Sequence, residues 1–223
     1  VYDLQHRKEC LIKLKSIDSI SKSNSRGLHV DLTKVNHMSA AGAVALFAVL
    51  TSVQINTHDD FISVSLPTNK AIRHQIRVSG LWDAIRPGGK RKLEKLWTLS
   101  SGFQSGYDPD KHLEPTIQLL EKQRTLPYRL KEAINEAMLN IVQHAYSANS
   151  DIETRWWQYA KIDPIKQNFI FVIYDRGINI PSKFPYITDD SLAIQHAMTI
   201  IENKFTRKKL NYIKCFADSL KVR

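Results

Sequence analysis

The alternation of apolar and polar residues divides the first third of the chain into short periodic segments. Two segments alternate between apolar and polar residues, as half-buried strands do, and two others are typical of helices. Ser39 immediately precedes the longer helical segment and is a favoured residue type for its N-cap. After a helical or partly ordered lead-in to about residue 25, the expected elements are strands at 28–33 and 61–66 and helices at 40–53 and 69–78. Strands that alternate with helices predict an α/β layer.

The second half of the chain has a different pattern. Glycine, proline and serine gather between about residues 86 and 110, which predicts a linker. Beyond it, apolar residues at 130, 134, 137, 138, 141, 142 and 145 form one helical stripe. Strands are expected at 155–160 and at 168–174, the second nearly all apolar and therefore central, and helices at 190–201 and 210–220. This order predicts an α/β sandwich with helices on one face, and two domains at 1–110 and 111–223.

Composition excludes several classes of protein. The chain has 223 residues, of which 43% are hydrophobic and 24% charged, as in ordinary globular proteins. No apolar run approaches the roughly 18 residues of a membrane span, and no signal peptide is recognisable, so we expect a cytoplasmic protein without a membrane partner. The first residue is Val1 rather than Met, which fits a fragment of a longer chain.

The net charge of +10 requires a cause. Basic proteins bind nucleic acids, anionic surfaces or phosphate-bearing ligands. The densest basic segment, residues 86–95, is expected to be a solvated linker rather than a helix face. An acidic partner and nucleic acid are the alternatives for this segment, although we expect no nucleic-acid partner for the protein as a whole.

The helix expected at 130–146 carries a second pattern, made of polar residues. Glu132, Glu136, Asn140 and His144 are spaced four apart and therefore form one ridge beside the apolar stripe. Such a ridge is either a solvated helix face or the wall of a ligand site. For a ligand site, the amide oxygen can coordinate Mg²⁺ and the carboxylate can orient or deprotonate a water molecule.

A further candidate directly follows the apolar strand at 168–174. Asp175 places a carboxylate at the end of that strand, where it can accept a hydrogen bond from an amino group such as that of adenine. Gly177 lets the backbone turn and approach a ligand closely. By itself this tripeptide is also typical of a plain turn.

Together, residues 136–145 resemble the N box of the GHKL ATP-binding superfamily, and residues 175–181 resemble its first glycine box. The resemblance implies a Bergerat-type α/β sandwich that binds ATP and Mg²⁺. It implies that Asn140 binds the metal, that Glu136 is the base where ATP is hydrolysed, and that Asp175 contacts adenine. His144 is then expected near the phosphates.

The chain departs from the GHKL pattern in two places. Asn179 stands where a second glycine is usual, and we expect the turn to survive because Asn tolerates positive φ. The second glycine box, which forms the phosphate lid, and the terminal strands have no counterpart here. Thr206, which we expect beside the nucleotide, opens a segment that leads directly into the last helix. Either the lid is degenerate or its residues are not represented, and the family-like helices on both sides favour the second explanation.

The first half resembles STAS domains, in which a strand delivers a phosphorylatable turn to the start of a helix. The resemblance covers residues 29–43, but Ala40 and Ala41 occupy the positions where the acceptor hydroxyl would fall, and only Ser39 could substitute. A generic α/β domain is the alternative. The resemblance implies a regulator closest to the anti-sigma-factor serine kinases, with Mg-ATP switching protein–protein contacts.

Several functions stay open at this stage. The switch could hydrolyse ATP slowly or act as a serine kinase, and its protein partner, or a second copy of the chain, would bind through either segment. The alternatives are an interaction module with a vestigial nucleotide site and a basic nucleic-acid-binding protein.

Overall fold

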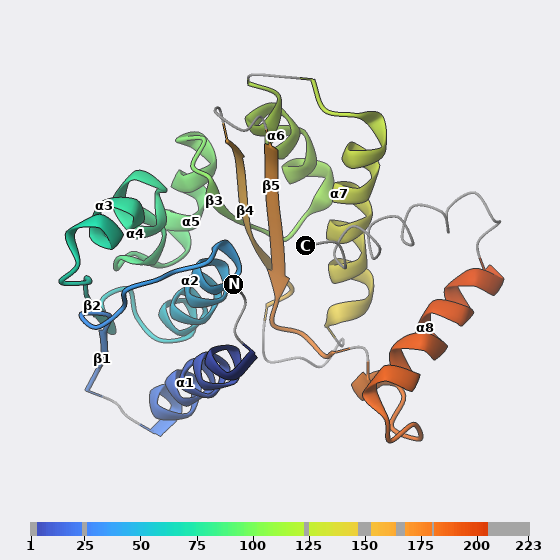
Figure 1. Ribbon diagram of the computed structural model, residues 1–223, viewed down its shortest axis with the longest axis horizontal. Helices are drawn as coiled ribbons and strands as arrows, with labels where there is room; N and C mark the ends of the chain where they lie inside the picture. Colours follow the sequence, from blue (N-terminus) through green and yellow to red (C-terminus); the bar gives the residue numbers. More distant parts are fainter. Residues whose placement is uncertain are drawn as a thin grey trace.

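A computed structural model of the chain describes residues 4–23, 26–122, 125–146, 153–163, 168–179 and 181–204. The protein has a mixed α/β fold, as expected, with two small sheets and helices packed around them (Figure 1). None of the helices in these ranges is both long and apolar enough to cross a bilayer. The elements are α1 (Leu4–Ser23), β1 (Leu28–Asp31), α2 (Ala40–Asn56), β2 (Ile62–Ser65), α3 (Lys70–Val78), α4 (Leu81–Ile85), α5 (Gly89–Thr98), β3 (Phe103–Gly106), α6 (Pro109–Glu121), α7 (Tyr128–Asn140), the π-helical turn η1 (Ile141–Ala145), β4 (Trp156–Asp163), β5 (Asn168–Asp175), the 3₁₀ turn η2 (Pro181–Lys183) and α8 (Asp190–Lys204).

The first sheet confirms the alternation found near the N-terminus. Strands β1 and β2 pair in parallel, with Val30 opposite Val64, and α2 provides the crossover that parallel strands require. The Ser39 hydroxyl accepts a hydrogen bond from the Gly42 amide at 3.1 Å and so caps α2 as predicted. Helix α2 is buried on nearly all sides, which explains why its sequence lacks a polar stripe.

The second sheet lies between two layers of helices. Its strand order is β3-β4-β5, all antiparallel, with α2 on one face and α6 and α7 on the other (Figure 1). Successive side chains of β4 serve the two faces, since Trp157 packs in the core around α2 and Trp156 in the core around α6 and α7. The Trp157 indole also donates to the Thr51 hydroxyl of α2 at 2.7 Å. Both tryptophans are therefore core residues.

Two predictions about this sheet are wrong. In the described part of the chain, β4 and not β5 is the central strand, and β5 owes its apolar sequence to the helices on both of its faces. Helices therefore cover both faces of the sheet rather than one.

The expected linker at 86–110 is also wrong, because it contains α5 and β3. Leu93 and Leu96 of α5 are buried, so the basic segment at 86–95 includes a packed helix rather than a solvated loop. Gly106 of β3 lies directly beneath the Trp156 ring, where a side chain would collide with it. Gly106 therefore serves close packing, and residues on both sides of the predicted boundary at 110 share one core.

A lysine from this basic segment is buried. The Lys92 ammonium donates to the Gln54 side-chain oxygen at 2.7 Å and to the Arg86 carbonyl at 2.6 Å, and the side chain is only 8% exposed. Burial, together with the positive charge of Arg86, lowers the pKa of Lys92 to about 7. Near neutral pH the folded protein therefore holds this amine only partly charged.

We expect the free energy of unfolding to rise by about 2 kcal/mol between pH 7 and 9, since an unfolded lysine keeps its proton to about pH 10.4 and the folded Lys92 does not. Stability increases with pH wherever the unfolded state binds more protons. Urea denaturation across this range would measure the rise, which should disappear in Lys92→Met and persist in Lys95→Met, an exposed lysine on the same helix. An unchanged pH dependence in Lys92→Met would contradict the assignment.

Candidate functional site

Helix α7 and its continuation η1 lie along the second sheet. Ile134, Met138, Ile141 and Ala145 are buried and pack in the core that contains Trp156. These four positions belong to the predicted apolar stripe, which is thereby confirmed as the sheet-facing side. The α-helix ends at Asn140, and the last turn is π-helical, a rare form that is frequent at functional sites.

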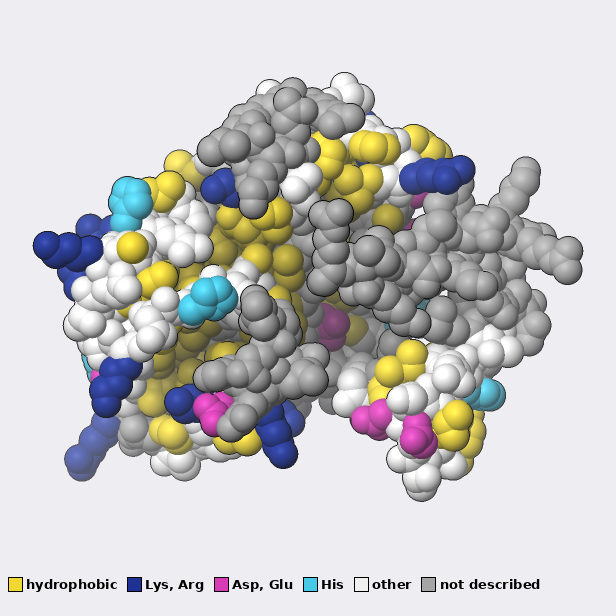
Figure 2. Space-filling view, viewed as in Figure 1, with side chains coloured by type: hydrophobic (Ala, Val, Ile, Leu, Met, Phe, Trp, Pro, Cys, Tyr) yellow, Lys and Arg dark blue, Asp and Glu magenta, His cyan; other side chains and the backbone are white. Residues whose placement is uncertain are grey.

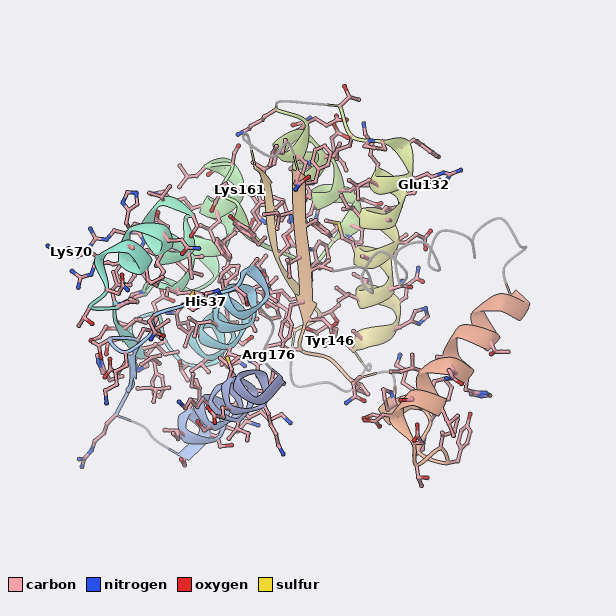
Figure 3. The ribbon with its side chains drawn as sticks, viewed as in Figure 1. His37, Lys70, Glu132, Tyr146, Lys161 and Arg176 are labelled. Atoms are coloured by element: carbon pink, nitrogen blue, oxygen red, sulfur yellow. The ribbon has the colours of Figure 1, made fainter. Side chains whose placement is uncertain are left out.

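The polar ridge lies on the outside of this helix. Glu136, Asn140 and His144 are exposed, whereas Glu132 is half-buried. The buried Oε2 atom of Glu132 has no hydrogen-bond partner among the described residues. Glu132 and Tyr146 mark the two ends of the helix in Figure 3. Exposure leaves Asn140 and His144 accessible to a ligand, as both interpretations of the ridge require.

The end of η1 docks onto the turn that follows β5. The Ile178 amide donates to the Ala145 carbonyl at 2.5 Å, and the Arg176 amide donates to the Tyr146 hydroxyl at 3.0 Å. The same hydroxyl donates to the Arg155 carbonyl at 2.6 Å, and burial raises the pKa of Tyr146 to about 12. Figure 3 shows Tyr146 and Arg176 near the end of β5. Residues 175–179, called the Asp175 turn below, thus contact the helix that carries the polar ridge.

Gly177 makes this contact possible. A Cβ atom at this position would overlap the Ala145 carbonyl oxygen and lie 2.9 Å from the Ala145 Cβ. Gly177 does not have a positive φ, so its role is close approach rather than an unusual backbone conformation. The close partner shown by the structure is the end of η1.

Asp175 is the residue of the Asp175 turn whose chemistry is most distinctive. It is half-buried, and burial raises its pKa above the ordinary carboxyl value. Its Oδ1 accepts a hydrogen bond from the Gly177 amide at 2.9 Å. An ionised carboxylate has about four acceptor sites, so this bond leaves capacity for a further donor.

Asn179 and Thr206 are the other two residues that the sequence places near the nucleotide. Asn179 does not adopt the positive φ that was expected to preserve the turn. Its side-chain oxygen instead accepts from the amide and the hydroxyl of Ser182, at 2.8 and 2.7 Å, and so holds the start of η2. Thr206 and the helix expected at 210–220 lie outside the described residues, as does any counterpart of the lid in that segment. Helix α8, just before them, is present as predicted.

The structure adds one residue pair that sequence reasoning missed. The Arg176 guanidinium forms an ion pair with Asp18 of α1, and the arginine side chain is 13% exposed. Helix α1 also packs on α2, so the pair ties the N-terminal helix to the Asp175 turn. No periodic signal could have identified two charges that are 158 residues apart.

Histidine, cysteine, aspartate and glutamate are the usual protein ligands of metal ions. Within the described part of the chain, no three such residues come together as a metal site. His37 and His74 are exposed. An Mg²⁺ ion at Asn140 would therefore take its remaining ligands from water and from a bound phosphate.

Comparisons with known proteins add no family to this geometry. The chain matches no protein-family model, no curated protein and no solved structure. The resemblances to GHKL and STAS domains stay predictions. The structure establishes a mixed α/β fold in which the two motif-bearing segments are in contact.

Proposed function

We propose that the protein binds Mg-ATP where helix α7–η1 meets the Asp175 turn, and that nucleotide binding switches its contacts with a protein partner. The observation that carries this proposal is the docking of Ala145 and Tyr146 onto the Asp175 turn. It joins a strand-end carboxylate to a helix that presents an amide and an imidazole to solvent. Segments with the order and spacing of the two GHKL motifs are therefore neighbours in space as well as similar in sequence.

The donor and acceptor groups fit the proposed ligand. The half-buried Asp175 carboxylate has acceptor capacity beyond its bond to the Gly177 amide, which suits the exocyclic amino group of adenine. Asn140 supplies one neutral oxygen, which suits Mg²⁺ because that ion commonly keeps several waters and binds through substrate phosphates. Bound ATP would supply the phosphoryl group for hydrolysis or transfer. Glu136 lies one helical turn from Asn140, and its carboxylate would orient or deprotonate the water or hydroxyl group that attacks the phosphate.

A path from the site to the rest of the protein supports the switching role. Arg176 is adjacent to Asp175 in the chain and pairs with Asp18 on α1. A ligand that displaces the Asp175 turn would strain or release this partly buried ion pair. Helix α1 exposes Leu11, Ile12 and Ile20, so a change in its position alters an apolar surface that a partner could contact.

We expect Asp175→Asn to weaken ATP binding by about 5- to 150-fold, which corresponds to about 1–3 kcal/mol for a mispaired hydrogen bond. The amide can turn a donor toward the adenine amino group, whereas the carboxylate only accepts. The bond from the Gly177 amide can be kept by the Asn Oδ1, so the variant should fold. Isothermal titration with Mg-ATP measures the change.

Asp110→Asn is the matched control, because Asp110 is exposed on α6. It should bind ATP as the wild type does. Equal affinity in the wild type and Asp175→Asn would remove Asp175 from the site, and a wild type that binds no ATP would reject the proposal in favour of a vestigial site.

A further inference from the structure

A cavity lies on the other side of the second sheet from α7. It has a volume of about 410 Å³ and is lined by residues from the start of α2, from α3 and from all three strands of the second sheet. Its apolar lining includes Ile76 of α3, Phe103 of β3 and Ile170 of β5. Figure 2 shows apolar side chains gathered on the face of the molecule that contains α3 and β5. The volume falls within the range of about 300–1,000 Å³ typical of small-molecule sites.

Tyr159 contributes a hydroxyl group to this cavity from a largely buried side chain. Its side chain packs on Phe103, with ring centroids 4.4 Å apart, and is 7% exposed. Its hydroxyl is not among the buried atoms that lack a partner, so it is open to the cavity and can donate to a ligand there. Tyr159 also lines an adjoining hollow of about 230 Å³. Burial raises the pKa of Tyr159, which keeps the hydroxyl protonated and able to donate.

The charge around the cavity is positive. Lys161 follows Tyr159 by two positions and therefore points to the same face of β4, where it lines both spaces from an exposed position (Figure 3). The first turn of α2 begins at the cavity with Ser39 and Ala40 and contains no acidic residue, so its dipole adds positive potential. Among the described residues that line the two spaces, none is acidic.

From these observations we propose that the cavity binds a small apolar monocarboxylate. The apolar body of the ligand would lie on Ile76, Phe103 and Ile170, and its carboxylate would accept from the Tyr159 hydroxyl and pair with the Lys161 ammonium. Lys161 is the one cation among the described residues that line this cavity, and Lys122 lines only the adjoining hollow. The other polar residues that line the cavity are Ser39, Ser79 and Gln75, and the Ser79 hydroxyl already donates to the Ile76 carbonyl. A single cation suits a monocarboxylate better than a phosphate dianion. The inference does not depend on the proposed ATP site, which lies on the opposite face of the sheet.

Isothermal titration of the full chain with decanoate and with 1-decanol would test the proposal. Decanoate should bind at least tenfold more tightly than decanol, because only the carboxylate can pair with Lys161. Lys161→Met should weaken decanoate binding about tenfold and leave decanol unchanged, and Tyr159→Phe should weaken decanoate about fivefold. Lys34→Met, an exposed lysine outside the cavity, is the matched control and should bind decanoate as the wild type does.

Three outcomes would overturn the proposal. They are the absence of decanoate binding to the wild type, equal affinities for decanoate and decanol, and an equal loss of affinity in Lys34→Met and Lys161→Met. Asp175→Asn should bind decanoate normally, which distinguishes a failure of this proposal from a failure of the ATP site.

Discussion

Replacing Gly177 with alanine is expected to lower the free energy of unfolding by about 3 kcal/mol, at the upper end of the usual cost of overpacking. The added Cβ would overlap the backbone oxygen of Ala145, which no change of side-chain rotamer can move. Relieving the overlap requires η1 to separate from the Asp175 turn, which breaks the bond between the Ile178 amide and the Ala145 carbonyl. Urea denaturation measures the loss.

Two further variants make the Gly177 result specific. Gly42→Ala changes a helical glycine whose Cβ would meet only the Ser39 hydroxyl, at 3.3 Å, so we expect little change or a gain of up to about 1 kcal/mol from helix propensity. Adding Ala145→Gly to Gly177→Ala should not restore stability, because the overlap involves a backbone atom. A loss below about 1 kcal/mol in Gly177→Ala, or full rescue by Ala145→Gly, would contradict the described contact.

The elements that the sequence predicts correctly are those with a strong local pattern. Strands β1 and β2 alternate apolar and polar residues, and α2 begins at Ser39 as its cap predicts. Helix α3 begins after Asn69, whose side chain accepts from two backbone amides, and ends before Gly80, which has a φ of 82°. Caps and periodicity act over a few residues, so they can be recognised without knowing the tertiary structure.

The elements that the sequence missed are specified by distant partners. Helix α5 has a polar and basic sequence, and only its packing buries Leu93, Leu96 and Lys92. Strand β3 is four residues long, and its glycine and serine resemble a loop until Trp156 of β4 is placed against them. The position of β5 at the end of the described sheet could not be read from its apolar composition, because burial by helices and burial by strands leave the same pattern.

The sequence predicts the candidate ligand-binding residues of the site but not the residues that hold its segments together. The sequence identified Asn140 and Asp175 because their motifs resemble a known family. Tyr146, which bridges two backbone segments through one hydroxyl, follows the predicted helix but belongs to neither motif. The pair formed by Arg176 and Asp18 depends on α1 packing against α2, a long-range contact that no local pattern indicates.

If the proposed Mg-ATP site is correct, Asn140 and Glu136 should have separable effects. Asn140→Ala should weaken binding of Mg-ATP far more than binding of metal-free ADP, because it removes a metal ligand. Glu136→Ala should leave ATP bound, and slightly tighter, since a carboxylate near a polyanion repels it unless a metal or water intervenes. Both residues are exposed, so neither substitution disturbs the core.

Loss of the Glu136 carboxylate should also reduce any ATP hydrolysis by about 10²–10⁴-fold, the usual contribution of a general base. The test is to measure phosphate release and nucleotide affinity in the wild type and in both variants. Gln143→Ala is the control, because Gln143 is exposed on η1 outside the polar ridge. Poor ATP binding with normal turnover per bound nucleotide in Glu136→Ala would reverse the assignment. If the wild type binds ATP without turnover, the protein is a nucleotide-gated switch and not an ATPase. Glu136 then has no catalytic role, and Asn140 alone accounts for the dependence of binding on Mg²⁺.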